Sequence, residues 1–229
     1  MASRKNRVIS LAVLGTLVDD RSGLARGLEA QGLAPDAARA LGGAALDRMG
    51  PLIEELEAFV PWEVLLVRAL RLAAGERGLQ LDESTARAAV SRMADWPLFD
   101  DVVPALASLA PAYRLALVSN LDQRRLEVLA RRLDVGPLHL VGADRVGCFL
   151  PEPDHLMALI HELEVDEDRV LQVSARPMED LLPAEGLGVA HAWVHRSDER
   201  GPGEVEIQIE AADLAALARR LTRRGRRRG

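Results

Sequence analysis

The sequence has 229 residues, enough for one domain or for a core with a small insert, and either arrangement can bury a sizeable apolar core. Its 48% hydrophobic and 28% charged residues are typical of a globular protein and exclude a disordered or collagen-like chain. The formal net charge is −6, but seven arginines fall in residues 219–229, so the rest of the chain carries −13. An acidic body of this kind is a poor match for nucleic acid.

The first part of the chain predicts one strand followed by a helical segment. Val8–Leu14 is a nearly continuous apolar run closed by Gly15 and Thr16, which indicates a buried parallel strand that ends in a tight turn. Apolar residues then recur at spacings of three and four, and they predict helices over residues 24–33, 37–49, 52–70 and 83–93. This helical segment could form a subdomain of its own.

Strand and helix signals alternate in the rest of the chain. Strands are predicted at residues 113–118, 138–141, 170–174 and 189–194, and helices at 124–133, 154–163 and 211–221. The pattern predicts the α/β class, a Rossmann-like parallel sheet with helices on both faces. We expect the arginine-rich residues 219–229 after the last helix to be a basic disordered tail.

Two residue counts limit the chemistry and the location of the protein. Cys148 is the only cysteine, which excludes an internal disulfide and a multi-cysteine zinc site and fits a reducing compartment. Lys5 is the only lysine, so a mechanism that needs a buried ammonium group has one candidate. Because no segment reaches the roughly 18 apolar residues of a membrane helix, we expect a cytoplasmic protein without a membrane anchor.

Four short segments of the sequence fall at the carboxyl ends of the predicted strands, which is where a parallel sheet carries its reactive centre. Together they resemble the haloacid dehalogenase superfamily, and particularly its 2-haloacid dehalogenase branch, over about residues 8–200. The matching segments are Gly15-Thr16-Leu17, Leu115–Asn120, Pro151–Asp154, and Val170–Ser174 with Asp180. The resemblance implies an α/β core over residues 1–19 and 97–218 and a helical cap, residues 20–96, inserted after the first strand.

The resemblance also implies that the charged residues of the family are missing. The positions of the nucleophilic aspartate, the second aspartate, the lysine and an acidic metal ligand hold Ala12, Leu14, Leu150 and Ala175. A methyl group cannot act as a nucleophile, and Mg²⁺ needs several oxygen ligands. The arginine of the cap falls near Gly43. We therefore expect no catalytic residue of the family's type, no metal and no cofactor.

Loss of the anionic aspartate together with the cationic lysine and arginine leaves an apolar pocket that contains no unpaired charge. Loss of only one of these groups would leave a buried charge without a partner. We interpret the chain as a pseudoenzyme that binds a small organic acid or a protein partner, a second copy of itself included. The alternative is a repurposed or residual hydrolase or dehalogenase that uses non-standard residues in the cleft between core and cap.

Several polar residues survive at these places, and each has a structural and a functional interpretation. The ligand-binding candidates are Thr16, Ser119, Asn120 and Asp180. The resemblance implies that the first three bind an anion in relatives, although they can also cap turns and helices. Asp180 is either a remaining carboxylate of the site or a first-turn helix residue favoured by the helix dipole. Asp19 and Asp20 are predicted to lie in a hinge loop. The five histidines show no metal-binding pair on one helix face.

Overall fold

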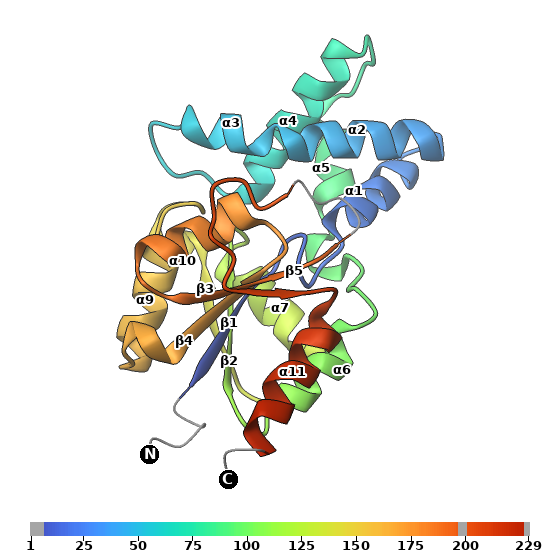
Figure 1. Ribbon diagram of the computed structural model, residues 1–229. Helices are drawn as coiled ribbons and strands as arrows, with labels where there is room; N and C mark the ends of the chain where they lie inside the picture. The colour runs from blue at the N-terminus through green and yellow to red at the C-terminus, as the bar shows by residue number, and fades with distance from the viewer. Residues whose placement is uncertain (1–6, 197–200, 227–229) are drawn as a thin grey trace. The chain divides into compact units, whose positions relative to one another are not determined.

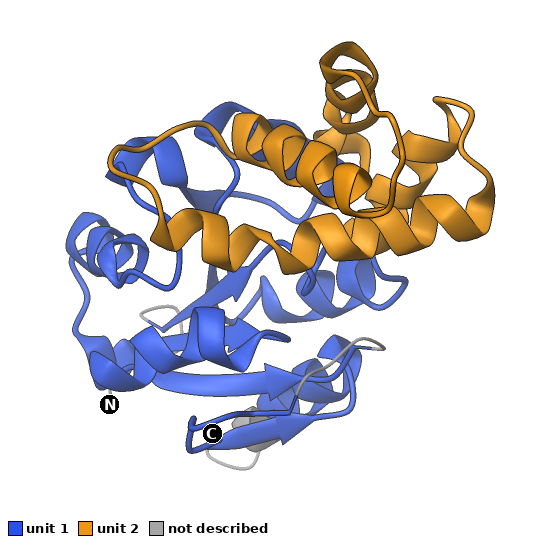
Figure 2. Ribbon diagram, turned by 90° about the horizontal axis from the view of Figure 1, so that it is seen from above, with its two compact units in different colours: residues 1–18, 98–229 blue, residues 19–97 orange. Residues whose placement is uncertain are grey.

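The computed structural model describes residues 7–196 and 201–226, and the chain forms two compact units (Figure 2). The core unit comprises Met1–Val18 and Leu98–Gly229, and the insert unit comprises Asp19–Pro97. Each junction lies one residue away from the predicted boundary between core and cap. Lys5 and residues 227–229 lie outside the described residues.

The core unit is built on six parallel strands in the order β3-β2-β1-β4-β5-β6 (Figure 1). They are β1 Val8–Ala12, β2 Arg114–Ser119, β3 Leu138–Gly142, β4 Val170–Ser174, β5 Ala190–Val194 and β6 Ile209–Ala211. The predicted parallel sheet is confirmed, and five of its strands lie close to their predicted positions. Sequence analysis missed β6, because a three-residue edge strand with Glu210 at its centre carries no apolar run.

Helices cover both faces of the sheet, as the alternating pattern predicts (Figure 1). The helices of this unit are α6 Val102–Leu109, α7 Gln123–Leu133, α8 Ala143–Val146, α9 Asp154–Leu163, α10 Leu182–Gly186 and α11 Leu214–Arg226. Two short helical turns complete it, the 3₁₀ turn η3 Glu167–Arg169 and the π turn η4 Pro177–Leu181. Buried side chains of α9 and α10 pack with Val8, Val118 and Val170 on one face, while α6 and α11 pack together on the other.

The insert unit is entirely helical in its regular structure. Its elements are α1 Asp20–Glu29, α2 Pro35–Asp47, α3 Met49–Glu54, α4 Trp62–Glu76, α5 Glu83–Val90 and the 3₁₀ turn η2 Met93–Asp95. The single helix predicted over residues 52–70 is wrong: α3 ends at Glu54, and Pro61 precedes the first residue of α4. A proline favours extended backbone in the residue before it, so a continuous helix cannot pass this point easily. No helix among the residues described in either unit is long and apolar enough to cross a membrane.

The prediction of a disordered tail from residue 219 is wrong for residues 219–226, which continue α11. The buried side chains of Leu214 and Leu217 hold this helix to the core, and the hydroxyl of Tyr113 donates to the carbonyl of Leu221 at 3.4 Å. Arginine has a high helix propensity, so the basic residues extend the helix that this packing begins.

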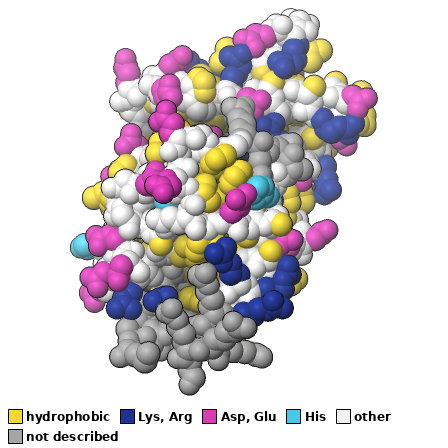
Figure 3. Space-filling model, viewed as in Figure 1, with side chains coloured by type: hydrophobic (Ala, Val, Ile, Leu, Met, Phe, Trp, Pro, Cys, Tyr) yellow, Lys and Arg dark blue, Asp and Glu magenta, His cyan; other side chains and the backbone are white. Residues whose placement is uncertain are grey.

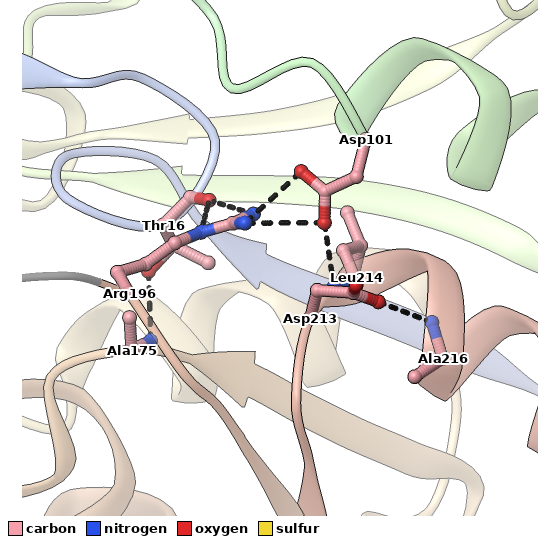
Figure 4. Close-up of polar contacts among 7 residues, drawn as sticks. All are labelled: Thr16, Asp101, Ala175, Arg196, Asp213, Leu214 and Ala216. Atoms are coloured by element: carbon pink, nitrogen blue, oxygen red, sulfur yellow. Dashed lines mark hydrogen bonds and ion pairs between the residues drawn. The ribbon is translucent and has the colours of Figure 1, made fainter.

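Arg196, just after β5, joins four segments of the core unit (Figure 4). Its guanidinium donates to the carboxylate of Asp101 at 3.0 and 3.1 Å, and to the carbonyl oxygen of Thr16 at 2.8 and 3.1 Å. It also lies 4.1 Å from the centre of the Phe99 ring. Asp101 in turn accepts from the backbone N–H of Leu214 at 2.7 Å. The turn after β1, the segment before α6, the end of β5 and the start of α11 are therefore held by one ion pair.

The Arg196–Asp101 pair generates a stability prediction. Both side chains are largely buried, with exposed fractions of 10% and 16%, so Asp101→Asn leaves a desolvated guanidinium without its counter-charge. Breaking such a pair from one side costs about 3 kcal/mol, and we expect the free energy of unfolding of the core to fall by about that amount in urea denaturation. Asp168→Asn removes the partner of Arg169 in a more exposed pair and should cost less than about 1 kcal/mol. Equal stability of the two variants would contradict the assigned role of Asp101.

Candidate functional site

The candidate site lies at the carboxyl ends of β1, β2 and β4 in the core unit, and a tight turn after β1 forms its centre. The N–H groups of Leu17 and Val18 both donate to the carbonyl of Val13, at 2.9 and 3.0 Å. Gly15 adopts a φ of +72°, which is readily accessible only to glycine. The Gly15-Thr16 pair thus predicted the turn correctly, because the turn requires a positive φ that glycine adopts readily.

Four apolar side chains occupy the positions that the resemblance assigns to charged groups. Ala12, Leu14, Leu150 and Ala175 are buried, with exposed fractions between 2% and 7%. Two of these positions are fixed by side chains of the candidate site: the N–H of Leu150 donates to Oδ1 of Asn120 at 2.8 Å, and the N–H of Ala175 donates to Oγ1 of Thr16 at 2.9 Å. The segments that carry Leu150 and Ala175 are therefore held at the carboxyl ends of the strands.

A buried chain of hydrogen bonds links Thr16 to Asp180. The hydroxyls of Thr16 and Ser174 are 3.3 Å apart, and the Ser174 hydroxyl donates to Oδ2 of Asp180 at 2.5 Å. All three residues are nearly inaccessible to solvent. Sequence analysis did not select Ser174, because a serine at the end of a strand is common and only the fold places it between two candidate residues.

The two candidates after β2 also have partners within the protein. Oγ of Ser119 accepts from the N–H of Leu121 at 3.1 Å, and Asn120 holds the backbone of Leu150. Each of the four candidates therefore stabilises a turn or joins two loops. These contacts explain the residue types, whereas binding of an anion by these residues stays a prediction.

Arg176, which sequence analysis missed, brings a positive charge to this edge. A Cβ atom on Gly15 would lie 2.5 Å from its Nε, so the guanidinium rests directly on the turn after β1. Its backbone N–H donates to Oγ of Ser174 at 2.8 Å, which ties its position to the buried chain. The site is thus apolar at the four positions that the resemblance assigns to charged groups but has an arginine beside them. The only signal for Arg176 in the sequence was its position two residues after the strand β4.

The side chains at the carboxyl ends of these strands do not fit a magnesium ion. Ala12, Leu14 and Ala175 offer no side-chain oxygen, and Asp180 accepts a hydrogen bond from Ser174. Within residues 7–196 and 201–226, no three His, Cys, Asp or Glu side chains are grouped so that they could hold a metal ion. Three histidines instead have protein partners, His139 with Glu162, His191 with the carbonyl of Glu206, and His195 with Glu210.

Two titratable groups near the site are electrically neutral at neutral pH. Burial lowers the pKa of His155, in the first turn of α9, to about 4, although the Ser119 backbone and Asp154 favour its charged form. Burial raises the pKa of the Cys148 thiol to about 11, and the nearby carboxylates of Asp154 and Glu152 raise it further. Neither group is prepared to act as a charged nucleophile or acid.

The candidate residues of the insert unit begin its first helix. Asp19 is the N-cap of α1 and accepts from the N–H of Ser22 at 2.9 Å, and Asp20 is buried in the first turn. These two residues therefore begin a helix and do not form a loop, although the junction between the two units does fall at Asp19. Gly43, where the resemblance places the cap arginine, has the guanidinium of Arg21 against it. Arg21 pairs with Asp47 at 2.8 Å. A positive charge therefore reaches this position from another helix, which the sequence order did not show.

Solved structures of L-2-haloacid dehalogenases are similar to this chain over nearly its whole length. The enzyme RSc1362 superimposes with a TM-score of 0.82 at 21% identity, covering 94% of this chain and 98% of the enzyme. The enzyme PA0810 has a TM-score of 0.77 at 26% identity, with coverage of 95% and 99%. The enzyme from Xanthobacter autotrophicus has a TM-score of 0.78 at 19% identity, with coverage of 94% and 98%. No family model matches the sequence, and no curated protein is significantly similar to it.

A parallel α/β core interrupted after its first strand by a helical insert defines the haloacid dehalogenase class of fold. This chain has that fold, in the form found in the L-2-haloacid dehalogenases, and the fold that the resemblance implies is confirmed.

The buried imidazole of His155 generates a pH prediction. With a folded pKa of about 4, below the ordinary 6.5, the unfolded chain binds the extra proton first as the pH falls. Full stability is therefore present above pH 6.5 and is lost between about pH 6.5 and 4, by about 1.4 kcal/mol per pH unit. His155→Leu should flatten this part of the pH dependence in denaturation experiments. The exposed His161→Gln should leave it in place, and an unchanged slope in His155→Leu would refute the assignment.

Proposed function

We propose that this protein is a non-catalytic member of the dehalogenase fold class that binds a small organic acid. The observation that carries the proposal is the burial of Ala12, Leu14, Leu150 and Ala175 at the edge where the resemblance places the nucleophile, the lysine and a metal ligand. The backbone hydrogen bonds of Leu150 and Ala175 support it, because they give these apolar positions a stable place in the fold.

The reaction of the family requires a group that the residues at this edge do not supply. The L-2-haloacid dehalogenase from X. autotrophicus has been solved with chloropropionic acid covalently bound, and a covalent bond of this kind requires a nucleophile. In the present chain the position that the resemblance assigns to the nucleophile holds Ala12, whose side chain is a methyl group. The nearby Ser174 and Thr16 hydroxyls are buried and hydrogen-bonded. We propose binding without bond formation, in the cytoplasm, with a small anion as the ligand; a second copy of the chain or another protein is the alternative partner.

A repurposed hydrolase is the second candidate, and one observation favours it. Asp180 and His155 are buried titratable groups at the edge of the sheet, and such groups are common in active sites. Against it, Asp180 is engaged by Ser174 and His155 is neutral at neutral pH. Activity that depends on Asp180 would distinguish this candidate from the first.

Turnover measurements test the proposal directly. Purified protein incubated with 2-chloropropionate, and separately with a generic phosphate ester, should release halide or phosphate no faster than a mock preparation. The reason is that neither a nucleophilic carboxylate nor a cation paired with it is present at Ala12 and Leu150. Clear turnover that Asp180→Asn abolishes would refute the non-catalytic role and favour the repurposed hydrolase.

Introducing a charge at position 12, at position 150 or at both tests whether these positions tolerate a charge only when its partner is also present. Ala12→Asp alone and Leu150→Lys alone should each destabilise the protein by several kcal/mol, because each buries a charge without a built partner. If the two side chains meet, as the resemblance implies, the double variant should be more stable than the sum of the single effects by about 1–3 kcal/mol. Strict additivity in urea denaturation would show that these positions do not face one another.

A further inference from the structure

We propose that a groove on the insert unit binds an acidic amphipathic helix of a partner protein. The groove lies between α4 and α5 and has a volume of about 390 Å³. Its lining consists of three arginines, one glutamate and three apolar side chains, and every lining residue belongs to the insert unit. The role of the groove therefore does not depend on the ligand proposed for the core unit.

The arginines give the groove a positive charge that its own carboxylate does not balance. Arg68, Arg71 and Arg87 line it together with Glu83. Arg87 donates to the carboxylate of Glu83 at 2.7 and 2.9 Å, which leaves Arg71 a longer contact of 3.6 Å with the same group. The lining thus carries three positive charges against one negative charge, although the insert unit as a whole has 9 arginines against 13 acidic residues.

Arg68 has the weakest ion pair of the three arginines. Its guanidinium is 3.9 Å from the carboxylate of Glu55, and both side chains are more than half exposed. An exposed pair of this length contributes little to stability, because water screens it. Arg68 can therefore exchange Glu55 for a carboxylate of a partner, with which a guanidinium forms two parallel hydrogen bonds.

Apolar side chains flank these arginines on the exposed side of α4. Val64 and Leu72 are 41% and 42% exposed, and each lies four residues from Arg68, so the three share one side of the helix. Eight residues of helix span about 12 Å, or roughly two turns. Figure 3 shows basic side chains beside apolar ones on the visible face of the insert unit. The side of α4 that lines the groove is thus apolar at both ends and basic between them.

An acidic amphipathic helix complements this arrangement in charge and in spacing. A helix that lies along a groove contacts it through the residues of one face, about one in each turn. Leucines two turns apart can cover Val64 and Leu72, while glutamates between them reach Arg68 and Arg71. The partner then supplies the negative charge that the lining lacks.

Two other occupants fit the groove less well. Nucleic acid is disfavoured because the insert unit has a net charge of 9 − 13 = −4, which repels phosphates beyond the groove. A second copy of the chain, docked through the same groove across a twofold axis, would place Arg68 and Arg71 against their own equivalents. Like charges that face one another across an interface are unfavourable.

The test is fluorescence anisotropy of a labelled peptide of about 18 residues, long enough to form a helix, titrated with the full chain. The peptide contains alanine, leucine and glutamate, with the glutamates between leucines on one helix face. We expect saturable binding with a dissociation constant in the micromolar range, which rises with salt because exposed charges are screened. A peptide with lysine in place of every glutamate should bind at least about 10-fold more weakly.

Variants of the groove identify the residues that hold the peptide. Arg68→Gln should weaken binding by about 10-fold, the loss expected for a hydrogen bond to a charged group, and Val64→Ser by about 3- to 10-fold through loss of apolar contact. Arg92→Gln removes an exposed arginine of the same unit that pairs with Asp95, and Val103→Ser changes a valine of α6 that is 40% exposed. These two control variants should bind like the parent protein, and all four should keep its circular dichroism spectrum.

Several results would overturn this assignment. They are the absence of binding by the glutamate peptide, equal affinity of the glutamate and lysine peptides, and equal affinity of the parent protein and Arg68→Gln. Tighter binding of a DNA duplex than of the peptide would contradict the proposal and favour nucleic acid. A dimer in sedimentation velocity that Arg68→Glu dissociates would contradict it in favour of a second copy of the chain.

Discussion

Thr16 is the residue on which the arrangement of the candidate site depends most. Its hydroxyl accepts from the N–H of Ala175, and its carbonyl accepts both N–H groups that Arg196 directs at it. One residue in the turn after β1 therefore connects the ends of β4 and β5 to that turn. Because Arg196 also holds Asp101 and, through it, the start of α11, the turn has little freedom to move without disturbing four segments. The geometry of the site follows from this network whether or not the site performs chemistry.

The same network explains how apolar residues can occupy the centre of the site at little cost. A buried ion pair loses much of its attraction to desolvation, and replacing both partners with apolar residues of suitable size can be neutral or stabilising. The backbone groups of Leu150 and Ala175 are already satisfied by Asn120 and Thr16, so these residues leave no unpaired N–H group behind. The remaining charge, Arg176, stands on the turn and is positioned by Ser174 and Gly15.

The sequence predicted the features that depend on local patterns. The apolar runs located five parallel strands, the spacing of three and four located the insert, and Gly15 marked the tight turn. Features that depend on residues far apart in the chain were not predictable: Arg196 and Asp101 are 95 positions apart, and Thr16 and Ala175 are 159 apart. The course of residues 219–226 was mistaken because composition alone suggested disorder, whereas the packing of Leu217 beneath them carries the helix forward. Arg176 was missed because an arginine in a loop is ordinarily solvated, and its place on Gly15 is visible only in three dimensions.

These contacts also explain why the structural likeness is strong although the sequence likeness is weak. Gly15, Thr16, Asn120 and Asp180 are the residues through which the sequence resembles the dehalogenases, and each is tied to a backbone requirement of the turn or to a hydrogen bond between loops. Residues that serve the fold in this way keep the carboxyl ends of the strands in place even where Ala12 and Leu150 lie at positions that the resemblance assigns to charged groups. The chain can therefore superimpose on L-2-haloacid dehalogenases with TM-scores of 0.77 to 0.82 at 19% to 26% identity. A likeness that resides in the scaffold of the site is compatible with a different use of its centre.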